Sequence, residues 1–241
     1  KEVTVPHGSV QLFKWDGSEY IADNSRSELL KYGSDGHILI TKDQYRYIFD
    51  GNGYLVEMVD RYGNTVNIKV DSFGRVSEVK DQAGNLYNIV YQNGLIKNIV
   101  DVKGGRTITY EYTSDGRLTK VTDAEGINTY YKYKQYVFDL AVGPVYVLSE
   151  ILDHNNNTVE RIEYYLDGEN VGKVETLVDR NGNRFRYEYY PQYGYNIIYD
   201  SNNYKQIKWY DERYSYSRVS DEVGDVKVKY YLDDKGENKY G

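Results

Sequence analysis

The residues that could bind a metal ion are three histidines and one acidic turn. His7, His37 and His154 lie far apart, and no second histidine follows any of them at the i+4 spacing of a helical metal site. Residues 179–183 read Asp-Arg-Asn-Gly-Asn, so oxygen-bearing side chains alternate as in a calcium loop. However, Arg184 stands where such a loop needs glycine, and the distal Glu is missing. We therefore predict no metal site and no other cofactor.

Carboxylates are the other candidates for chemistry, because glycoside hydrolysis needs two of them within several ångströms. The chain has 37 Asp and Glu residues, but no pair stands out, since most Asp residues occupy turn sequences. Several Glu residues alternate with apolar neighbours, as on a solvated strand face: Glu57, Glu78, Glu111, Glu163, Glu175 and Glu188. No G-x-S-x-G motif or phosphate loop is present. The sequence therefore predicts a protein that is not an enzyme and has no catalytic residues.

The composition excludes further classes. The chain has 241 residues, a net charge of −7 and no Cys, so a disulfide scaffold, a thiol nucleophile and a Cys-ligated zinc are ruled out. The negative charge argues against nucleic-acid binding. The longest apolar run, residues 137–148, is too short for a membrane span and contains Asp139, Gly143 and Pro144. With no initiator Met and no signal-peptide core, we expect a segment of a longer protein.

Tyrosine is unusually frequent, with 30 copies, although the mean hydropathy is −0.74. Its ring buries apolar area while its hydroxyl lowers the hydropathy score. Many copies recur at one place in a repeat, namely Tyr91, Tyr110, Tyr112, Tyr131, Tyr133, Tyr187 and Tyr189. We interpret them as ladders that stabilise a sheet. A platform on which carbohydrate stacks is the alternative.

Aspartates mark the repeat. Gaps of 21, 20, 22, 30, 26, 21 and 21 residues separate Asp60, Asp81, Asp101, Asp123, Asp153, Asp179, Asp200 and Asp221. A block G-x-h-x-x-h-x-D, where h is apolar, precedes several of them, at residues 53–60, 74–81, 94–101, 116–123 and 172–179. A turn D-x-x-G-N begins at three, at residues 60–64, 81–85 and 179–183. An alternating run that ends in Tyr-x-Tyr follows, as at residues 110–112, 131–133 and 187–189.

The pattern predicts that each repeat forms a β-hairpin. Asp opens a turn by bonding to the backbone ahead of it, and Gly closes the turn with a positive φ. Alternating Val, Ile, Thr and Tyr predicts strands of about six residues with one buried face. Two strands and two turns give the period of roughly 20 residues. The only helix candidate is residues 25–31. We therefore predict an all-β fold, a curved antiparallel sheet of about eight hairpins.

In these motifs the chain resembles the YD-repeat (Rhs) family. The resemblance is carried by the D-x-x-G-N turns, by Gly-Arg-Leu-x-x-Val-x-Asp at residues 116–123 and by Tyr-x-Tyr at residues 110–112. It predicts a repeat array over residues 45–241 and a lead-in β segment over residues 1–44. In this family such hairpins form a spiralling sheet that closes into a hollow shell around a C-terminal toxin, and related repeats occur in wall-associated proteins and adhesion receptors. An Asp-Pro-x-Gly core motif is missing, so the self-cleavage of the family is not carried over.

The resemblance implies a structural segment of a shell in a secreted or cell-surface bacterial protein. Its partners would be the remaining shell repeats and the toxin domain of the same polypeptide. A carbohydrate-binding or adhesion module is the alternative. Open sheet edges also predict self-association of the fragment. The 30-residue gap before Asp153 predicts a longer loop near residues 134–145, which is either a tolerated insertion or a binding loop.

Overall fold

The computed structural model describes residues 2–4, 10–15, 17–18, 20–22, 25–33, 36–139, 143–210, 216–221, 226–229, 231–232 and 238–239. The chain divides into two compact units. The first comprises Lys1–Tyr110 with Asp123–Glu125, and the second comprises Glu111–Thr122 with Gly126–Gly241. Apart from one short 3-10 helix, Pro191–Tyr193, every element of the described chain is a strand.

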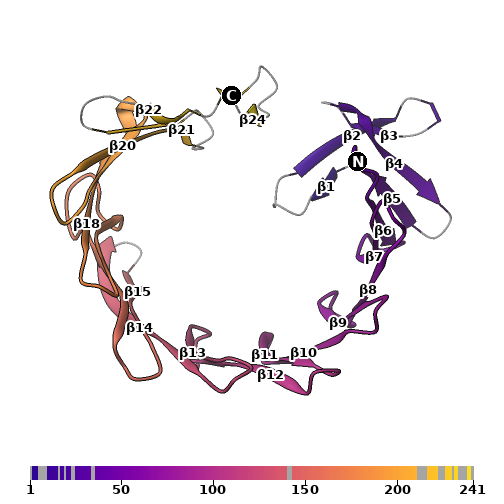
Figure 1. Cartoon of the computed structure of the whole chain (residues 1–241), viewed down its shortest axis with the longest axis horizontal. Helices are drawn as coiled ribbons and strands as arrows, with labels where there is room; N and C mark the ends of the chain where they lie inside the picture. Colours follow the sequence, from indigo (N-terminus) through magenta and orange to yellow (C-terminus); the bar gives the residue numbers. More distant parts are fainter. Residues whose placement is uncertain are drawn as a thin grey trace. The chain divides into compact units, whose positions relative to one another are not determined.

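The first unit is a β-meander, in which each described strand pairs antiparallel with the next (Figure 1). Its strands are β1 (Glu2–Thr4), β2 (Val10–Trp15), β3 (Tyr20–Ala22), β4 (Ser25–Gly33), β5 (Gly36–Ile40), β6 (Arg46–Asp50), β7 (Leu55–Val59), β8 (Thr65–Val70), β9 (Val76–Asp81), β10 (Leu86–Gln92) and β11 (Leu95–Asp101). Strand β12 (Arg106–Tyr112) pairs with β11 and runs across the boundary between the units.

The second unit continues the same pattern of antiparallel neighbours up to β22. Its strands are β13 (Leu118–Thr122), β14 (Asn128–Asp139), β15 (Gly143–Leu152), β16 (Thr158–Tyr164), β17 (Val174–Asp179), β18 (Arg184–Tyr190), β19 (Tyr195–Tyr199), β20 (Lys205–Tyr210), β21 (Tyr216–Asp221) and β22 (Val226–Lys229). A separate pair joins β23 (Tyr231–Leu232) and β24 (Asn238–Lys239). The predicted all-β class and hairpin architecture are confirmed.

The helix candidate at residues 25–31 is a strand in the structure. These residues belong to β4, which pairs with β3 on one side and with β5 on the other. A helix of seven residues makes few internal hydrogen bonds, so it is marginal in water. Neighbouring strands supply ladder partners along both edges of β4, and this tertiary pairing overrides local propensity.

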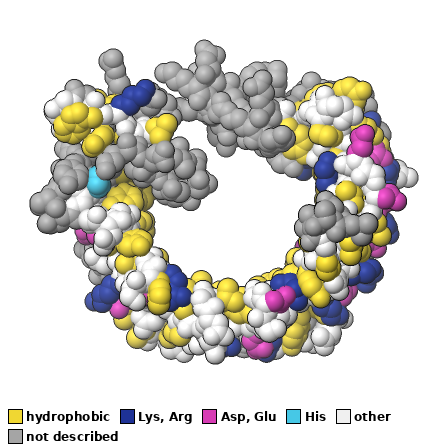
Figure 2. All heavy atoms as spheres, turned by 180° about the vertical axis from the view of Figure 1, so that it is seen from behind, with side chains coloured by type: hydrophobic (Ala, Val, Ile, Leu, Met, Phe, Trp, Pro, Cys, Tyr) yellow, Lys and Arg dark blue, Asp and Glu magenta, His cyan; other side chains and the backbone are white. Residues whose placement is uncertain are grey.

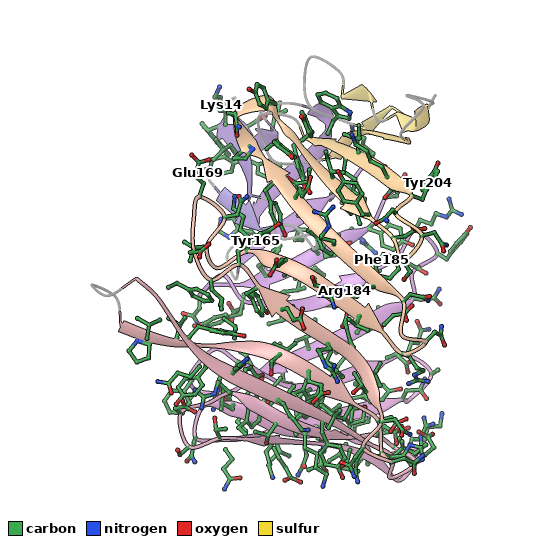
Figure 3. All side chains as sticks on the ribbon, turned by 90° about the vertical axis from the view of Figure 1, so that its left-hand side faces the viewer. Lys14, Tyr165, Glu169, Arg184, Phe185 and Tyr204 are labelled. Carbon is green, nitrogen blue, oxygen red and sulfur yellow. The ribbon has the colours of Figure 1, made fainter. Side chains whose placement is uncertain are left out.

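The longer loop predicted near residues 134–145 is also mostly wrong. Residues 134–139 and 143–145 are strand, because β14 and β15 extend their hairpin through the pairs Gln135↔Tyr146 and Tyr136↔Val145. Residues 140–142 lie outside the described residues. Figure 3 shows this hairpin projecting beyond its neighbours. The 26-residue gap before Asp179 does contain an irregular connection, at residues 165–173.

Strand register separates two faces in each unit, because side chains alternate along a strand and cross-strand partners share a face. One face, here called the apolar face, carries an almost continuous apolar row. In the first unit it contains Leu39, Tyr47, Met58, Val66, Ile68, Val79, Tyr87, Ile89, Ile99 and Ile108. In the second unit it contains Tyr131, Ile151, Ile162, Leu177, Phe185, Tyr187 and Ile198.

The opposite face, here called the polar face, carries the ion pairs that join strand residues. These are Lys69–Glu78, Lys120–Glu111, Lys132–Glu150, Arg161–Glu150, Arg184–Glu163 and Arg186–Glu188. Figure 2 shows hydrophobic and charged side chains interspersed over the surface that it presents. Antiparallel sheets commonly have one solvated face that carries charges and one apolar face that packs against other groups.

The deepest burial lies mainly on the polar face, where long side chains lie over small ones. Thr176 is 2% exposed, and Arg184 Nη2 donates to its hydroxyl over 3.3 Å. Val59, Leu152 and Ile197 are buried on the same face. On the apolar face the buried residues of the described chain are Leu39 and Phe13, which form a small core. From Tyr47 onward the apolar row stays partly exposed.

Because successive strands run in opposite directions, the turns that connect them lie alternately at the two edges of the sheet where strands end. The repeat period equals two strands, so in each unit the Asp turns gather on one edge, here called the Asp edge. They begin at Asp60, Asp81, Asp101 and Asp123 in the first unit and at Asp153, Asp179 and Asp200 in the second. In Figure 3, Glu169 marks the opposite edge of the second unit and Tyr204 marks its Asp edge.

Candidate functional site

The candidate metal-binding residues do not converge. His7 lies outside the described residues. His37 lies on β5 opposite Phe49, and the exposed His154 lies in the turn after Asp153 in the other unit. Within the part of the chain that the structure describes, no three His, Asp or Glu side chains form a group that could hold an ion.

The turn at residues 179–183 shows what the recurring aspartate does instead. Asp179 Oδ1 accepts hydrogen bonds from the backbone N–H groups of Asn181 (2.8 Å) and Asn183 (2.9 Å), and Oδ2 accepts one from the Asn183 side-chain amide (2.8 Å). The Asn183 amide, with these backbone donors, holds the pKa of Asp179 below its ordinary value. Both carboxylate oxygens are therefore engaged by the turn itself.

The same turn also explains the glycine and asparagine positions of the D-x-x-G-N motif. Gly182 N donates to Asp179 O, and Asp179 N donates to Asn183 O, both over 3.0 Å. This closure places Gly182 at φ +83°, where glycine has no steric penalty. The turn after Asp153 has the same bonds with Asn156 at that position, at φ 63°. Asparagine tolerates this region better than other side chains.

The motif tyrosine has an equally definite role. Tyr189, the second Tyr of its Tyr-x-Tyr sequence, donates from its hydroxyl to Val174 O over 2.8 Å. Tyr91 donates to Val76 O over 2.9 Å, with the same separation of 15 residues. Each bond joins the end of one strand to the start of the preceding strand, so it closes the open end of a hairpin. We call this arrangement the Tyr clamp.

A basic residue completes the clamp. Arg75 and Lys173, which follow the motif glycine, lie over the rings of Tyr91 and Tyr189 at 4.2 and 5.0 Å from the ring centroids. Arg117 lies 5.7 Å from the centroid of Tyr133. A cation over an aromatic face is attracted by the ring quadrupole. The motifs did not predict this pairing, although a basic residue 16 positions before a Tyr recurs in the sequence.

Removing the clamp hydroxyl is expected to destabilise the second unit. Tyr189→Phe keeps the ring but leaves Val174 O without this donor, so the free energy of unfolding should fall by about 1 kcal/mol in urea titrations. Tyr193→Phe is the matched control, because Tyr193 is 64% exposed and its described contact is between rings. An equal loss in both variants would contradict the clamp.

The glutamates singled out from the sequence mostly form ion pairs. Lys69 lies 2.8 Å from Glu78, and Lys120 lies 3.1 Å from Glu111. Glu150, which the sequence did not single out, has three partners, because it accepts from Thr158, Lys132 and Arg161. The Thr158 hydroxyl leads the interactions that lower the pKa of Glu150.

One cluster on the second unit combines a carboxylate with two phenols. Glu188 pairs with Arg186 and accepts from the hydroxyls of Tyr190 (3.0 Å) and Tyr199 (3.3 Å). Burial works to raise the pKa of Glu188, but these hydrogen bonds outweigh it and the pKa is lowered. The hydrogen bond to Glu188 raises the pKa of Tyr190. The cluster supplies one ionised carboxylate, whereas glycoside hydrolysis needs two with different protonation states.

Aromatic side chains form a cross-strand row on the second unit, and Trp15 and Tyr20 form a cross-strand pair on the first. Tyr190, Tyr195 and Trp209 are register partners on β18, β19 and β20, with centroid separations of 5.0 and 4.8 Å. Among the residues whose burial the structure describes, the two most exposed aromatics, Tyr62 (74%) and Phe73 (78%), lie in the turns at opposite ends of β8. They are therefore not neighbours on one platform, and carbohydrate binding stays a prediction.

The family model described as RHS Repeat matches residues 92–127. No curated protein matches the chain significantly. The described residues contain no helix long and apolar enough to cross a membrane.

Similar solved structures include the crystal structure of TcdB2-TccC3, with 10% identity, a TM-score of 0.47, and coverage of 98% of this chain and 15% of that one. TcdB2-TccC3 without its hypervariable C-terminal region gives 12% identity, a TM-score of 0.45, and coverage of 98% and 16%. The chain thus spans about a sixth of the solved chains that it resembles.

Proposed function

We propose that this chain, which is an RHS-repeat protein, forms part of the wall of a shell that encloses a toxin or effector encoded C-terminal to it in the same polypeptide. In this role the protein is secreted or displayed on the cell surface of a bacterium, and it performs no catalysis itself. Its partners are further repeats of the shell and the enclosed domain.

The observation that carries the proposal is the difference between the two faces of one sheet layer. The polar face carries charged side chains, several of which form ion pairs between strands, so it is suited to water. The apolar face repeats Ile, Val and Tyr from strand to strand and stays partly exposed in the described chain. Such a face is stabilised when another apolar surface covers it. An enclosed domain would provide that cover.

Cysteine labelling of the complete polypeptide tests this, because the chain has no cysteine of its own. Tyr87 and Val90 are matched positions on β10, 39% and 44% exposed, and they lie on the apolar and the polar face respectively. We expect a maleimide-polyethylene glycol to label Val90→Cys and to spare Tyr87→Cys under native conditions, with both labelled in urea. Any other cysteine of the polypeptide is replaced first. Equal native labelling of both positions would refute an enclosed apolar face.

Self-association of the fragment through sheet edges is a separate prediction. A chain with unpaired edge strands is expected to show a mass that grows with concentration in light scattering. A constant monomer mass at high concentration would contradict it.

A further inference from the structure

We propose that Asn93 is the preferred site of spontaneous deamidation in the folded chain, with isoaspartate as one product. The chain contains three exposed Asn-Gly pairs, at residues 52–53, 93–94 and 181–182. Glycine after asparagine offers the least steric hindrance to attack by its backbone nitrogen. From the local sequence alone, the three pairs would therefore be similarly reactive.

The reaction needs the glycine nitrogen as its nucleophile. After solvent hydroxide removes its proton, Gly94 N attacks Asn93 Cγ, a new C–N bond forms, and the Cγ–Nδ2 bond breaks to release ammonia. Water then opens the cyclic imide. Cleavage at the Cγ carbonyl gives aspartate, and cleavage at the main-chain carbonyl gives isoaspartate. No oxidant, reductant or enzyme is required, and water is the only co-reactant.

Tertiary structure distinguishes the three nitrogens. Gly53 N donates to Asp50 O, and Gly182 N donates to Asp179 O, each over 3.0 Å. The preceding asparagines are held as well, because Asn52 N and Asn181 N donate to the side chains of these aspartates over 2.9 and 2.8 Å. At these two turns the nucleophile must leave a hydrogen bond before it can react.

The turn at residues 93–94 is built differently. It has only two residues between the paired Gln92 and Leu95, with φ values of 53° and 83°, and it has no aspartate to clamp it. Among the described residues, Gly94 N donates no hydrogen bond. An added Cβ on Gly94 would also meet nothing within 4 Å, so the approach to this turn is open.

The two products should differ in their structural effect. Aspartate at position 93 keeps the backbone and tolerates φ 53° nearly as asparagine does. Isoaspartate adds a methylene to the main chain inside a two-residue turn, and this breaks the Gln92↔Leu95 register. Deamidation at this position therefore adds negative charge and, in one branch, opens the β10–β11 hairpin.

The test is peptide mapping by mass spectrometry after native incubation of the chain at mildly alkaline pH. Isoaspartate is identified by protein-isoaspartate methyltransferase labelling. We expect Asn93 to convert faster than Asn52 and Asn181 by on the order of fivefold, the factor that one backbone hydrogen bond provides. In urea the three rates should become similar. Native rates as similar as those in urea, or faster conversion at Asn52 or Asn181, would overturn the proposal.

A variant tests the cause. Asp50→Ala removes the side-chain acceptor that holds Asn52 N and Tyr54 N, so Asn52 should then react at a rate closer to that of Asn93. Asp43→Ala, in the preceding turn, is the control and should leave the rate at Asn52 unchanged. If Asp50→Ala leaves that rate unchanged while the chain stays folded by circular dichroism, the Asp50 side chain is not the source of protection.

Discussion

Replacing Gly36 with alanine is expected to lower the free energy of unfolding by about 3 kcal/mol or more, because steric overlap and backbone strain act together. Gly36 has φ +150° and pairs with Gly33 on one side and with Asp50 on the other. A Cβ at this position would lie 1.8 Å from Phe49 O. The clash is with backbone, so no side-chain rotation relieves it, and the end of the β5–β6 ladder must open.

Gly53→Ala provides the matched control in the same unit. Gly53 also has a positive φ, +88°, but an added Cβ would meet nothing within 4 Å, so only the backbone preference is lost. We expect a loss of about 1 kcal/mol. Urea titration of both variants against the wild type measures the difference. Equal losses would show that the close approach of Phe49 O does not constrain position 36.

Acid is expected to unfold the chain through its turns. The turn aspartates with pKa values below the ordinary value are Asp60, Asp71, Asp81, Asp101, Asp115, Asp153 and Asp179. At Asp60 and Asp81 the leading cause is the hydrogen bond from the side chain of the Asn four residues ahead. Because several turns contribute a carboxylate with a lowered pKa, their effects on stability add up.

The sign follows from proton linkage. A lowered folded-state pKa means that the unfolded chain binds protons first as the pH falls. The stabilisation is therefore fully present above the unfolded-state pKa of about 3.9 and is lost as the pH drops through the folded-state values. Urea midpoints measured from neutral pH to about pH 3 should be flat at first and then fall steeply.

A single substitution should reduce that slope. Asp179→Asn keeps one acceptor oxygen but removes the titrating charge, so it should lower stability at neutral pH and weaken the acid dependence. Asp43→Asn is the control, because no described hydrogen bond engages the Asp43 carboxylate. If both variants titrate like the wild type, the turn carboxylates are not the source of the acid sensitivity.

The sequence by itself determined the β-hairpin array and its period, because Asp, Gly and alternating apolar residues encode turns and strands through interactions within about five residues. Only tertiary pairing decided that residues 25–33 form a strand and that the hairpin β14–β15 extends through residues 134–139. In both places the deciding hydrogen bonds come from neighbouring strands, which the local pattern does not specify.

The candidate site also contains some features that the sequence predicted and others that only the tertiary structure determined. The Asp turn could be predicted because its partners lie two and four residues ahead, as at Asp179. The Tyr clamp and the ion-paired polar face could not, because Tyr189 and Val174 meet only once register is fixed across two strands. Gly36 and Gly53 look alike as turn glycines in the sequence, yet only Gly36 lies against a neighbouring carbonyl oxygen. Interactions between residues close in sequence determine the turns of this protein, whereas the strand register determines which side chains contact each other across neighbouring strands.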